Sequence, residues 1–450
     1  MKVAIIGAGW AGLAACAALR EADAQVTVFE AGRTPGGRAR RVVHPAFGAQ
    51  LDNGQHILLG AYDQTLALMR RVGRNPATLL MRRSLRLASL DGQFRLSAPA
   101  LPAPWHALAA LLAARGLGWP ERVAALRLMR GLRQMAWLPP RDWTVAQLLA
   151  HFQQPDRLAR LLWEPLCLAG LNTPLAEASA VLYARILHDS LAGTRHDSDL
   201  LLPCVDLSAL WPDAVALRAN MRYGDTVRHL VPSARGVDVN RERFDAAVLA
   251  VPPSVAARLL GNALREAGTP GLLKALQAFD YLPIGTLNLR LAGPWPLPEP
   301  MMLLREDRAR GQVGQWVFDR SRLTGRGPGG ELAIVTSAAR GLAETDRAAA
   351  IAALTAQVAE QAARHPARLP PMPPVEAAEL FIEKRATFAA VPGLVRPLNT
   401  TPWATLALAG DWTDTGYPGV LEGAVRSGLQ AARVLLKRLQ VRAGEQAPRH

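Results

Sequence analysis

A glycine-rich turn near the N-terminus has the residue types and spacing of a phosphate-binding loop. Gly7, Gly9 and Gly12 follow the apolar segment 2–6 directly, and each glycine has its own physical use. The first permits a tight turn, the second lets the backbone approach a pyrophosphate, and the third lets a helix pack closely on a strand. The N–H groups at the start of that helix then face the phosphates. The pattern predicts a dinucleotide site, and Ala11 is included among its residues.

The acid Glu30 stands at the end of the next apolar segment, 18 residues after Gly12. A carboxylate at that place in a βαβ unit accepts hydrogen bonds from a ribose 2′-OH. The elements that must position these residues are a strand over 2–6, a helix over 13–21 and a strand over 25–29. The glycine motif alone is also compatible with an ordinary βαβ turn, but the three elements and the acid together favour a dinucleotide.

A second glycine pair distinguishes between dinucleotides. Shortly after Glu30 and Ala31 comes the run Arg33-Thr34-Pro35-Gly36-Gly37-Arg38, which ends in Gly37 and Arg38. This run resembles the extended FAD signature of the amine oxidase and phytoene desaturase flavoprotein superfamily. NAD-dependent dehydrogenases normally lack such a loop, so the resemblance implies that the cofactor is FAD.

The C-terminal part of the chain is similar to the flavin motif of the same superfamily. Gly410 and Asp411 end an apolar segment. A helix is expected from Val420 to Leu439, and Val420 and Leu421 in its first turn are assigned to the cofactor site. The resemblance implies that Asp411 binds the ribityl–pyrophosphate region and that the helix N-terminus faces the flavin pyrimidine ring. A helix N-terminus there stabilises the negative charge of reduced flavin.

A third segment completes the expected cofactor domain. Residues 245–253 are predicted to form the central strand that returns to this domain. Upstream, Thr226-Val227-Arg228 occupies the place where members of the superfamily contact adenine through backbone groups. The assignment of Val227 to the cofactor site is therefore implied by the resemblance.

The segment 47–62 narrows the resemblance to one branch. Superfamily members place an Asp-x-Gly stretch beside the flavin here, which assigns Gly54, Gln55 and His56 to the cofactor site. The longer form of this segment, together with residues 163–174, resembles the squalene-associated FAD-dependent desaturases, or hydroxysqualene dehydroxylases. This branch implies that hydroxysqualene loses its hydroxyl and gains hydride from reduced FAD, giving squalene for hopanoid synthesis. The partner is then a long apolar polyprenyl substrate, and the donor that reduces the flavin is unknown.

Loss of a hydroxyl calls for a proton source. His56 is the first candidate because its motif lies near the flavin, and Glu164 is the second. The alternatives are that His56 orients backbone or binds the cofactor, and that Glu164 caps a helix or forms an ion pair. Tyr417 is expected to line the pocket near the flavin ring, and water or reduced flavin would also serve as a donor. The catalytic residue is therefore left unknown.

Other functions use the same fold. A carotenoid or phytoene-type desaturase and a flavin amine oxidase are the enzymatic alternatives, and a flavin-stabilised lipid-binding protein is the non-enzymatic one. An amine oxidase that holds its flavin through a C-terminal cysteine is excluded because no cysteine follows Cys204. The five tyrosines of the chain also argue against an aromatic cage for an amine.

The chain is strongly basic, which narrows its partners. The formal net charge is +15, and lysine occurs only at positions 2, 274, 384 and 437, so the excess is arginine. Anionic membrane surfaces and acidic ligands are the expected attractions. Nucleic acid is not expected, because no zinc-ligand spacing and no RNA-binding aromatic signature occur. No metal site is expected either.

The cysteines and the apolar segments suggest a location. Cys16, Cys167 and Cys204 are widely spaced and form no disulfide framework, which fits a reducing compartment. The first predicted strand starts at residue 2, so no signal peptide is expected, and no apolar run is long enough to span a bilayer. A cytoplasmic protein is predicted, with peripheral attachment to the inner face of the membrane left open.

A basic segment favours that attachment. Residues 105–141 carry six arginines against one acid, Glu121. At about 100° per residue, one arc of a helical wheel carries Arg122, Arg127, Arg130 and Arg133. The opposite arc carries Leu128, Met129, Leu132, Met135 and Ala136. Because Trp105, Trp119 and Trp137 lie near the ends of these helices, the segment suits a bilayer interface. A helix packed on the protein with a solvated arginine face is the alternative.

The expected fold class is α/β, with a discontinuous Rossmann-type FAD-binding domain, an α+β substrate domain and a helical insertion. The FAD domain is assigned to 1–75, 205–270 and 395–440. A helical insertion at 76–204 and a mixed-sheet region at 271–394 form the substrate domain, and 441–450 is a flexible tail. The mixed-sheet region is expected to contain strands near 285–291, 312–318, 331–337 and 375–384 and a helix near 348–364.

Overall fold

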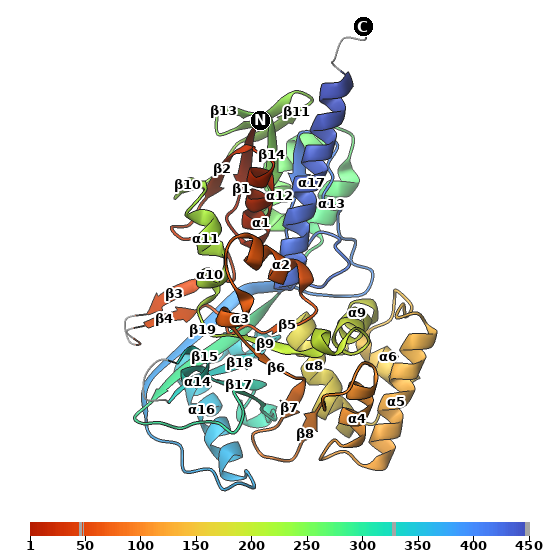
Figure 1. The fold of residues 1–450 in the computed structure, drawn as a ribbon, viewed down its shortest axis with the longest axis vertical. Coiled ribbons are helices and arrows are strands. Elements are labelled where there is room, and N and C mark those ends of the chain that lie inside the picture. Colours follow the sequence, from red (N-terminus) through yellow and green to blue (C-terminus); the bar gives the residue numbers. More distant parts are fainter. Residues whose placement is uncertain (45–46, 48, 326–329, 446–450) are drawn as a thin grey trace.

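A five-stranded parallel sheet forms the centre of one half of the molecule (Figure 1). The computed structural model describes residues 1–44, 47, 49–325 and 330–445. The strand order is β10 (Asn220–Tyr223), β2 (Gln25–Glu30), β1 (Lys2–Ile6), β14 (Ala246–Leu249) and β20 (Leu406–Leu408). Residues 3–6 of β1 and all of β14 are buried, as expected for parallel strands covered on both faces. The predicted strands near the N-terminus and at 245–253 are confirmed.

Two helices lie side by side against this sheet, α1 (Trp10–Glu21) and α17 (Leu421–Glu445). Gly428 allows them to approach closely, because a Cβ there would lie 2.1 Å from the carbonyl oxygen of Ala11. Helix α17 begins at the expected place but continues to Glu445, beyond the predicted end at Leu439. Residues 446–450 of the expected tail lie outside the described residues. Helices α12 (Pro253–Glu266) and α13 (Pro270–Gln277) complete this half.

A second sheet of five antiparallel strands forms part of the other half. Its order is β16 (Met301–Leu303), β17 (Trp316–Asp319), β18 (Glu331–Thr336), β15 (Tyr281–Leu291) and β19 (Val375–Phe388). Helix α16 (Arg347–Ala363) contributes Leu354 and Val358 to the core that this sheet shares. The strands and the helix predicted for this region are confirmed, although β17 begins at Trp316 rather than near residue 312.

A helical region packs beside the antiparallel sheet and lies at the lower right of Figure 1. Its long helices are α4 (Trp105–Leu112), α5 (Trp119–Gln134), α6 (Val145–His151), α8 (Glu164–Leu171) and α9 (Ala180–Leu191). Helix α7 (Asp156–Leu158) and a π-helical turn at Ala159–Trp163 lead directly into α8. Thr144 begins α6 with a capping box, in which its hydroxyl accepts from the Gln147 N–H.

The remaining strands and helices are short. The short sheets pair β3 (Arg41–His44) with β4 (Ala49–Asp52), β7 (Arg86–Ala88) with β8 (Arg95–Ser97), and β9 (Leu200–Pro203) with both β5 (Leu58–Leu59) and β6 (Leu80–Arg83). A three-stranded sheet contains β11 (Leu230–Ser233), β12 (Gly236–Val239) and β13 (Glu242–Phe244). Short helices are α2 (Asp63–Arg71), α3 (Pro76–Leu79), α10 (Leu207–Leu210), α11 (Pro212–Ala216), α14 (Arg320–Thr324) and α15 (Arg340–Glu344). The predicted α/β fold class is confirmed.

Candidate active site

The two glycine loops of the N-terminal region meet directly. The Gly36 N–H donates to the Ala8 carbonyl at 2.8 Å, and Gly9 pairs with Gly36 in a β-bridge. A Cβ at Gly9 would have the Cα of Gly37 as its nearest neighbour, at 3.9 Å, so the space above this backbone is open. Gly12 differs, because a Cβ there would lie 2.0 Å from the Gly7 carbonyl oxygen. Gly9 therefore forms an open cradle and Gly12 a packing contact.

Glu30 closes one end of this cradle. Its Oε2 accepts from the Ala8 N–H and its Oε1 from the Gly32 N–H, each at 2.7 Å. Two backbone donors thus fix the carboxylate at the end of β2. A carboxylate has about four lone-pair sites, so acceptor capacity remains for a ribose hydroxyl.

An ion pair joins the N-terminal loop to the C-terminal motif. Arg38 donates from Nη2 to Asp411 Oδ1 at 2.5 Å and from Nη1 to the Ala386 carbonyl at 2.7 Å. Burial opposes the charged form of Arg38, but Asp411 raises the pKa of the guanidinium overall. Two predicted site residues that are 373 positions apart are therefore in contact.

Arg396, which the sequence motifs do not predict, holds the loop that follows Asp411. Its guanidinium donates to the carbonyl oxygens of residues 411, 412, 413 and 417. Burial lowers the pKa of this guanidinium. No local motif marks Arg396, because its partners become neighbours only when the loop folds around it.

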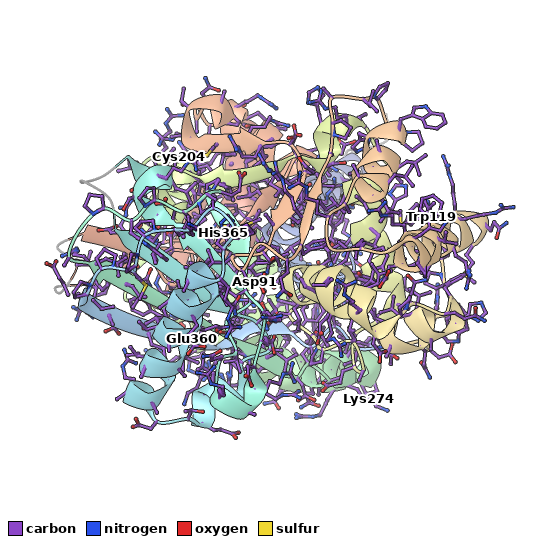
Figure 2. All side chains as sticks on the ribbon, turned by 90° about the horizontal axis from the view of Figure 1, so that it is seen from below. Asp91, Trp119, Cys204, Lys274, Glu360 and His365 are labelled. Carbon is purple, nitrogen blue, oxygen red and sulfur yellow. The ribbon has the colours of Figure 1, made fainter. Side chains whose placement is uncertain are left out.

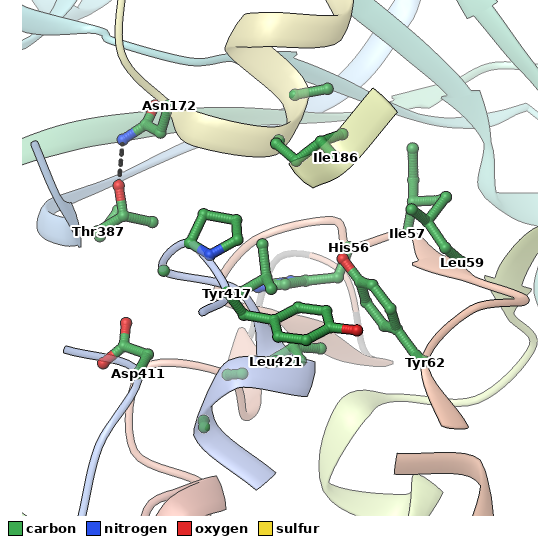
Figure 3. Close-up of a pocket in the computed structure, with 18 of the residues that line it drawn as sticks. His56, Ile57, Leu59, Tyr62, Asn172, Ile186, Thr387, Asp411, Tyr417 and Leu421 are labelled. Carbon is green, nitrogen blue, oxygen red and sulfur yellow. Dashed lines mark hydrogen bonds between the residues drawn. The ribbon is translucent and has the colours of Figure 1, made fainter. Parts of the chain in front are cut away.

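The ring of His56 faces the cavity beside Tyr417 and Leu421 (Figure 3). Its Nδ1 lies 2.7 Å from the Gly54 carbonyl oxygen, which only accepts, so Nδ1 carries the proton. Burial lowers the pKa of His56, which favours the neutral ring. In that form Nε2 is an acceptor, so the structure favours the orienting role of His56 over the acid role.

One cavity of about 920 Å³ brings these groups together. The predicted cofactor residues that line it are Gly7, Gly9, Ala11, Glu30, Ala31, Gly37, Arg38, Gly54, Gln55, His56, Val227, Gly410, Asp411, Val420 and Leu421. Gly12 lies behind this surface, against Gly7. The glycine cradle, the fixed Glu30 carboxylate and the start of α17 together suit a long dinucleotide that carries a second ring system.

The same cavity continues as an apolar chamber between the helical region and the antiparallel sheet. Its walls come from α4, α5, α9, the turn before α8 and strands β16 to β18. They include Leu108, Leu111, Met129, Leu162, Trp163, Ile186, Met301, Trp316 and Phe318. Apolar walls of this kind exclude water and accept a hydrocarbon chain.

Glu164, the second candidate acid, lies next to the cavity. It is not among the described residues that line the cavity, whereas its neighbours Trp163 and Leu166 are. Its carboxylate lies 3.9 Å from Arg308, and burial together with Glu306 raises its pKa. The structure thus gives Glu164 an ion-pair partner, and its role as an acid stays a prediction.

Asn172 ends α8 in the left-handed conformation, with φ 48°, and joins three segments. Its amide donates to the Leu282 carbonyl at 3.1 Å and to Thr387 Oγ1 at 3.0 Å. Its oxygen accepts from the Ala338 N–H at 2.6 Å. These bonds fasten the helical region to both long strands of the antiparallel sheet.

Replacing Glu30 or Asp411 with alanine should lower the FAD content of the purified protein about tenfold in each case, because each change removes a charge-assisted hydrogen bond. The ratio of flavin to protein in the absorbance spectrum measures this. The exposed Glu266 on α12 provides a control, and Glu266→Ala should retain full flavin. Wild-type flavin ratios in both variants would contradict the assignments.

Comparison with known proteins identifies related sequences. The sequence profile of the family described as flavin containing amine oxidoreductase matches residues 10–436. A hydroxysqualene dehydroxylase from Rhodopseudomonas palustris is 30% identical, over 96% of this chain and 98% of its own length. One from Sinorhizobium fredii is also 30% identical, over 97% and 98%. A probable zeta-carotene desaturase from Synechococcus elongatus is 24% identical, over 65% and 66%.

Solved structures share the fold. Cyclohexylamine oxidase from Brevibacterium oxydans superposes with a TM-score of 0.68 at 19% identity, covering 98% of this chain and 99% of its own. Wild-type putrescine oxidase gives 0.67 at 18% identity, with 97% and 99% covered. An oxidoreductase from Methanosarcina mazei gives 0.70 at 16% identity, with 96% and 100% covered.

Proposed function

This chain belongs to the flavin-containing amine oxidoreductase family and is an FAD-dependent oxidoreductase, and we propose that it reductively removes the hydroxyl group of hydroxysqualene to give squalene. One observation carries the proposal. The cavity that holds the cofactor residues continues without a break into the apolar chamber. The full-length relatives named hydroxysqualene dehydroxylase support the same substrate.

The residues of the cradle would hold FAD in the half that contains the parallel sheet. Gly7, Gly9 and Gly37 would surround the pyrophosphate, Glu30 would bind ribose, and Asp411 would bind near the ribityl chain. When bound and reduced, FAD supplies a hydride. The chain itself would bind the polyprenyl tail in the chamber and exclude water from the reacting carbon.

The apolar walls of the chamber bear on the alternatives. Arg185 lines the cavity, but Asp189 pairs with it at 3.0 Å, so this charge is compensated. A polyprenyl alcohol or hydrocarbon suits the apolar walls better than a small charged amine. A desaturase is therefore the stronger enzymatic alternative, and an amine oxidase is the weaker one.

An anaerobic single-turnover experiment tests the proposal. The purified protein is reduced with dithionite, hydroxysqualene is added, flavin absorbance is followed and the lipid is extracted. Reoxidation of the flavin with one squalene formed per flavin supports the dehydroxylase. Recovery of the alcohol with reduced flavin would overturn it, and phytoene-type precursors with the oxidised protein would then be tried.

We also propose that the helical region binds an anionic membrane surface. Trp105, Trp119 and Leu138 are 60%, 66% and 71% exposed, although large apolar side chains are usually buried. Trp119 lies at the outer edge of this region (Figure 2). The exposed side chains of Arg127, Arg130 and Arg133 belong to the same helix as Trp119. Within the described residues, no helix is both long and apolar enough to cross a bilayer.

The double variant Trp105→Ser/Trp119→Ser should bind vesicles of anionic lipid at least tenfold more weakly than the wild type, because interfacial tryptophan contributes to anchoring. Sedimentation with liposomes at two salt concentrations measures the binding. The control is Leu217→Ser/Val231→Ser, which removes exposed apolar side chains from the cofactor half. Equal binding by the wild type and both double variants would contradict the assigned surface.

A further inference from the structure

A cluster of polar side chains interrupts the apolar wall of the cavity. Tyr417 comes from the loop before α17, and Arg185 and Asp189 come from α9. Their positions on α9 are four residues apart, so both lie on one face of the helix. Figure 3 shows Tyr417 close to His56, Tyr62 and Leu421, which lie where the flavin ring is proposed to bind.

The hydroxyl of Tyr417 is held as a proton donor. Arg185 donates to this oxygen from Nη2 at 3.1 Å, and because arginine has no acceptor, the hydroxyl hydrogen is donated elsewhere, to Asp189. A substrate oxygen would replace Asp189 as its acceptor. The ring is only 6% exposed and lies between two guanidinium groups, with the Arg426 carbon 4.4 Å from its centre. Glu422 fixes Arg426 by accepting from Nε at 2.7 Å.

This environment suits both states of the donor. Burial raises the pKa of Tyr417, so the hydroxyl is protonated at neutral pH, while Arg185 acts in the opposite direction. After the proton has left, the phenolate would lie between the positive charges of Arg185 and Arg426. Fixed charges that are aimed at a developing negative charge stabilise the transition state.

A connected path leads from Tyr417 to solvent. Asp189 interacts with the Tyr417 hydroxyl, and its Oδ2 accepts from Arg185 Nε at 3.0 Å. Its Oδ1 lies 2.9 Å from Nδ1 of His188, whose side chain is 43% exposed. A buried donor that is used once per turnover must recover its proton, and this path provides a route.

We propose that Tyr417 protonates the departing hydroxyl of the substrate, that Arg185 positions Tyr417 and that Asp189 returns its proton. The inference rests on the proposed function. The C–O bond breaks with its electron pair on oxygen, which takes the Tyr417 proton and leaves as water. The carbon would receive the hydride that bound, reduced FAD supplies. The phenolate then regains a proton from solvent through Asp189 and His188.

The leaving group of the substrate provides the decisive test. For hydroxysqualene, Tyr417→Phe should slow anaerobic flavin reoxidation at least about 100-fold, the range of general acid catalysis. For the acetate ester of hydroxysqualene, the same variant should react within about threefold of the wild type, because acetate leaves without a proton. Binding of hydroxysqualene to the oxidised protein, followed by tryptophan fluorescence, should change less than about threefold.

The outcomes separate this inference from the function on which it rests. If the wild type forms squalene and Tyr417→Phe is equally fast with the alcohol, the donor assignment is overturned and the function stands. The donor assignment is also overturned if Tyr417→Phe slows the reactions of the alcohol and the acetate ester equally. It is overturned as well if Tyr62→Phe, rather than Tyr417→Phe, slows only the reaction of the alcohol. If the wild type forms no squalene from the alcohol, both proposals fall. Flavin content and melting temperature show that each variant is folded, and the exposed Tyr223→Phe is the control.

The role of Asp189 in returning the proton has a separate test. Asp189→Asn keeps the shape of the side chain but removes its charge. The first turnover should stay within about threefold of the wild type, because Tyr417 already carries its proton, whereas later turnovers should slow at least about tenfold. Equal slowing of the first and later turnovers, or no slowing of either, would overturn the proton path through Asp189.

Discussion

Replacing Gly9 with valine should yield a folded protein that purifies without FAD. Gly9 caps the start of α1 with φ −72° and ψ 176°, which any residue adopts, and the nearest neighbour of a Cβ there would be the Cα of Gly37, at 3.9 Å. The side chain would instead fill the space that the proposed pyrophosphate site needs. We expect the affinity for FAD to fall at least about 100-fold, or about 2.7 kcal/mol.

The matched variant is Gly12→Ala, in the same motif. Its Cβ would lie 2.0 Å from the Gly7 carbonyl oxygen, so backbone must move and the fold itself should lose stability. Circular dichroism and thermal melting of the flavin-free proteins separate the two effects. A Gly9→Val protein that retains full flavin would contradict the cradle, and an unfolded one would contradict the open space at Gly9.

Replacing Glu422 with alanine should lower the free energy of unfolding by about 3–5 kcal/mol, the usual cost of leaving a buried charge unpaired. The carboxylate is completely buried and accepts from the Thr65 N–H at 2.9 Å, the Thr65 hydroxyl at 2.6 Å and Arg426 Nε at 2.7 Å. It therefore links the first turn of α2 to α17. The variant leaves these donors without their acceptor.

Urea denaturation of the flavin-free protein measures this loss. The control is Glu21→Ala, which removes a carboxylate that is 49% exposed and paired with Arg71. Exposed ion pairs contribute at most about 1 kcal/mol, so the control should unfold near the wild-type midpoint. Similar midpoints for both variants would show that Glu422 does not hold the two helices together.

The parallel sheet and the glycine cradle were predictable because their signals are local. Gly7, Gly9 and Gly12 lie between two apolar segments. Their pattern can be recognised without reference to any distant residue. The lining positions of His56 and Asp411 followed from their motifs in the same way. Each of these positions is set within a short segment, where the order of residues determines the geometry.

The contacts among distant segments were not predictable. Arg185 and Tyr417 are 232 residues apart, and no spacing in the sequence connects them. The ion pair of Glu164 with Arg308 was likewise not predictable, because the two residues lie 144 positions apart in the sequence.

The way in which Arg38 meets Asp411 also dictates when the cofactor can be captured during synthesis. A ribosome completes strands β1, β2, β10 and β14 long before it reaches β20 and α17. Until then the nascent chain has the first glycine loop but lacks the partner of Arg38 and the helix that starts at Leu421. Flavin loading is therefore a late event, and products that terminate before residue 406 should be colourless.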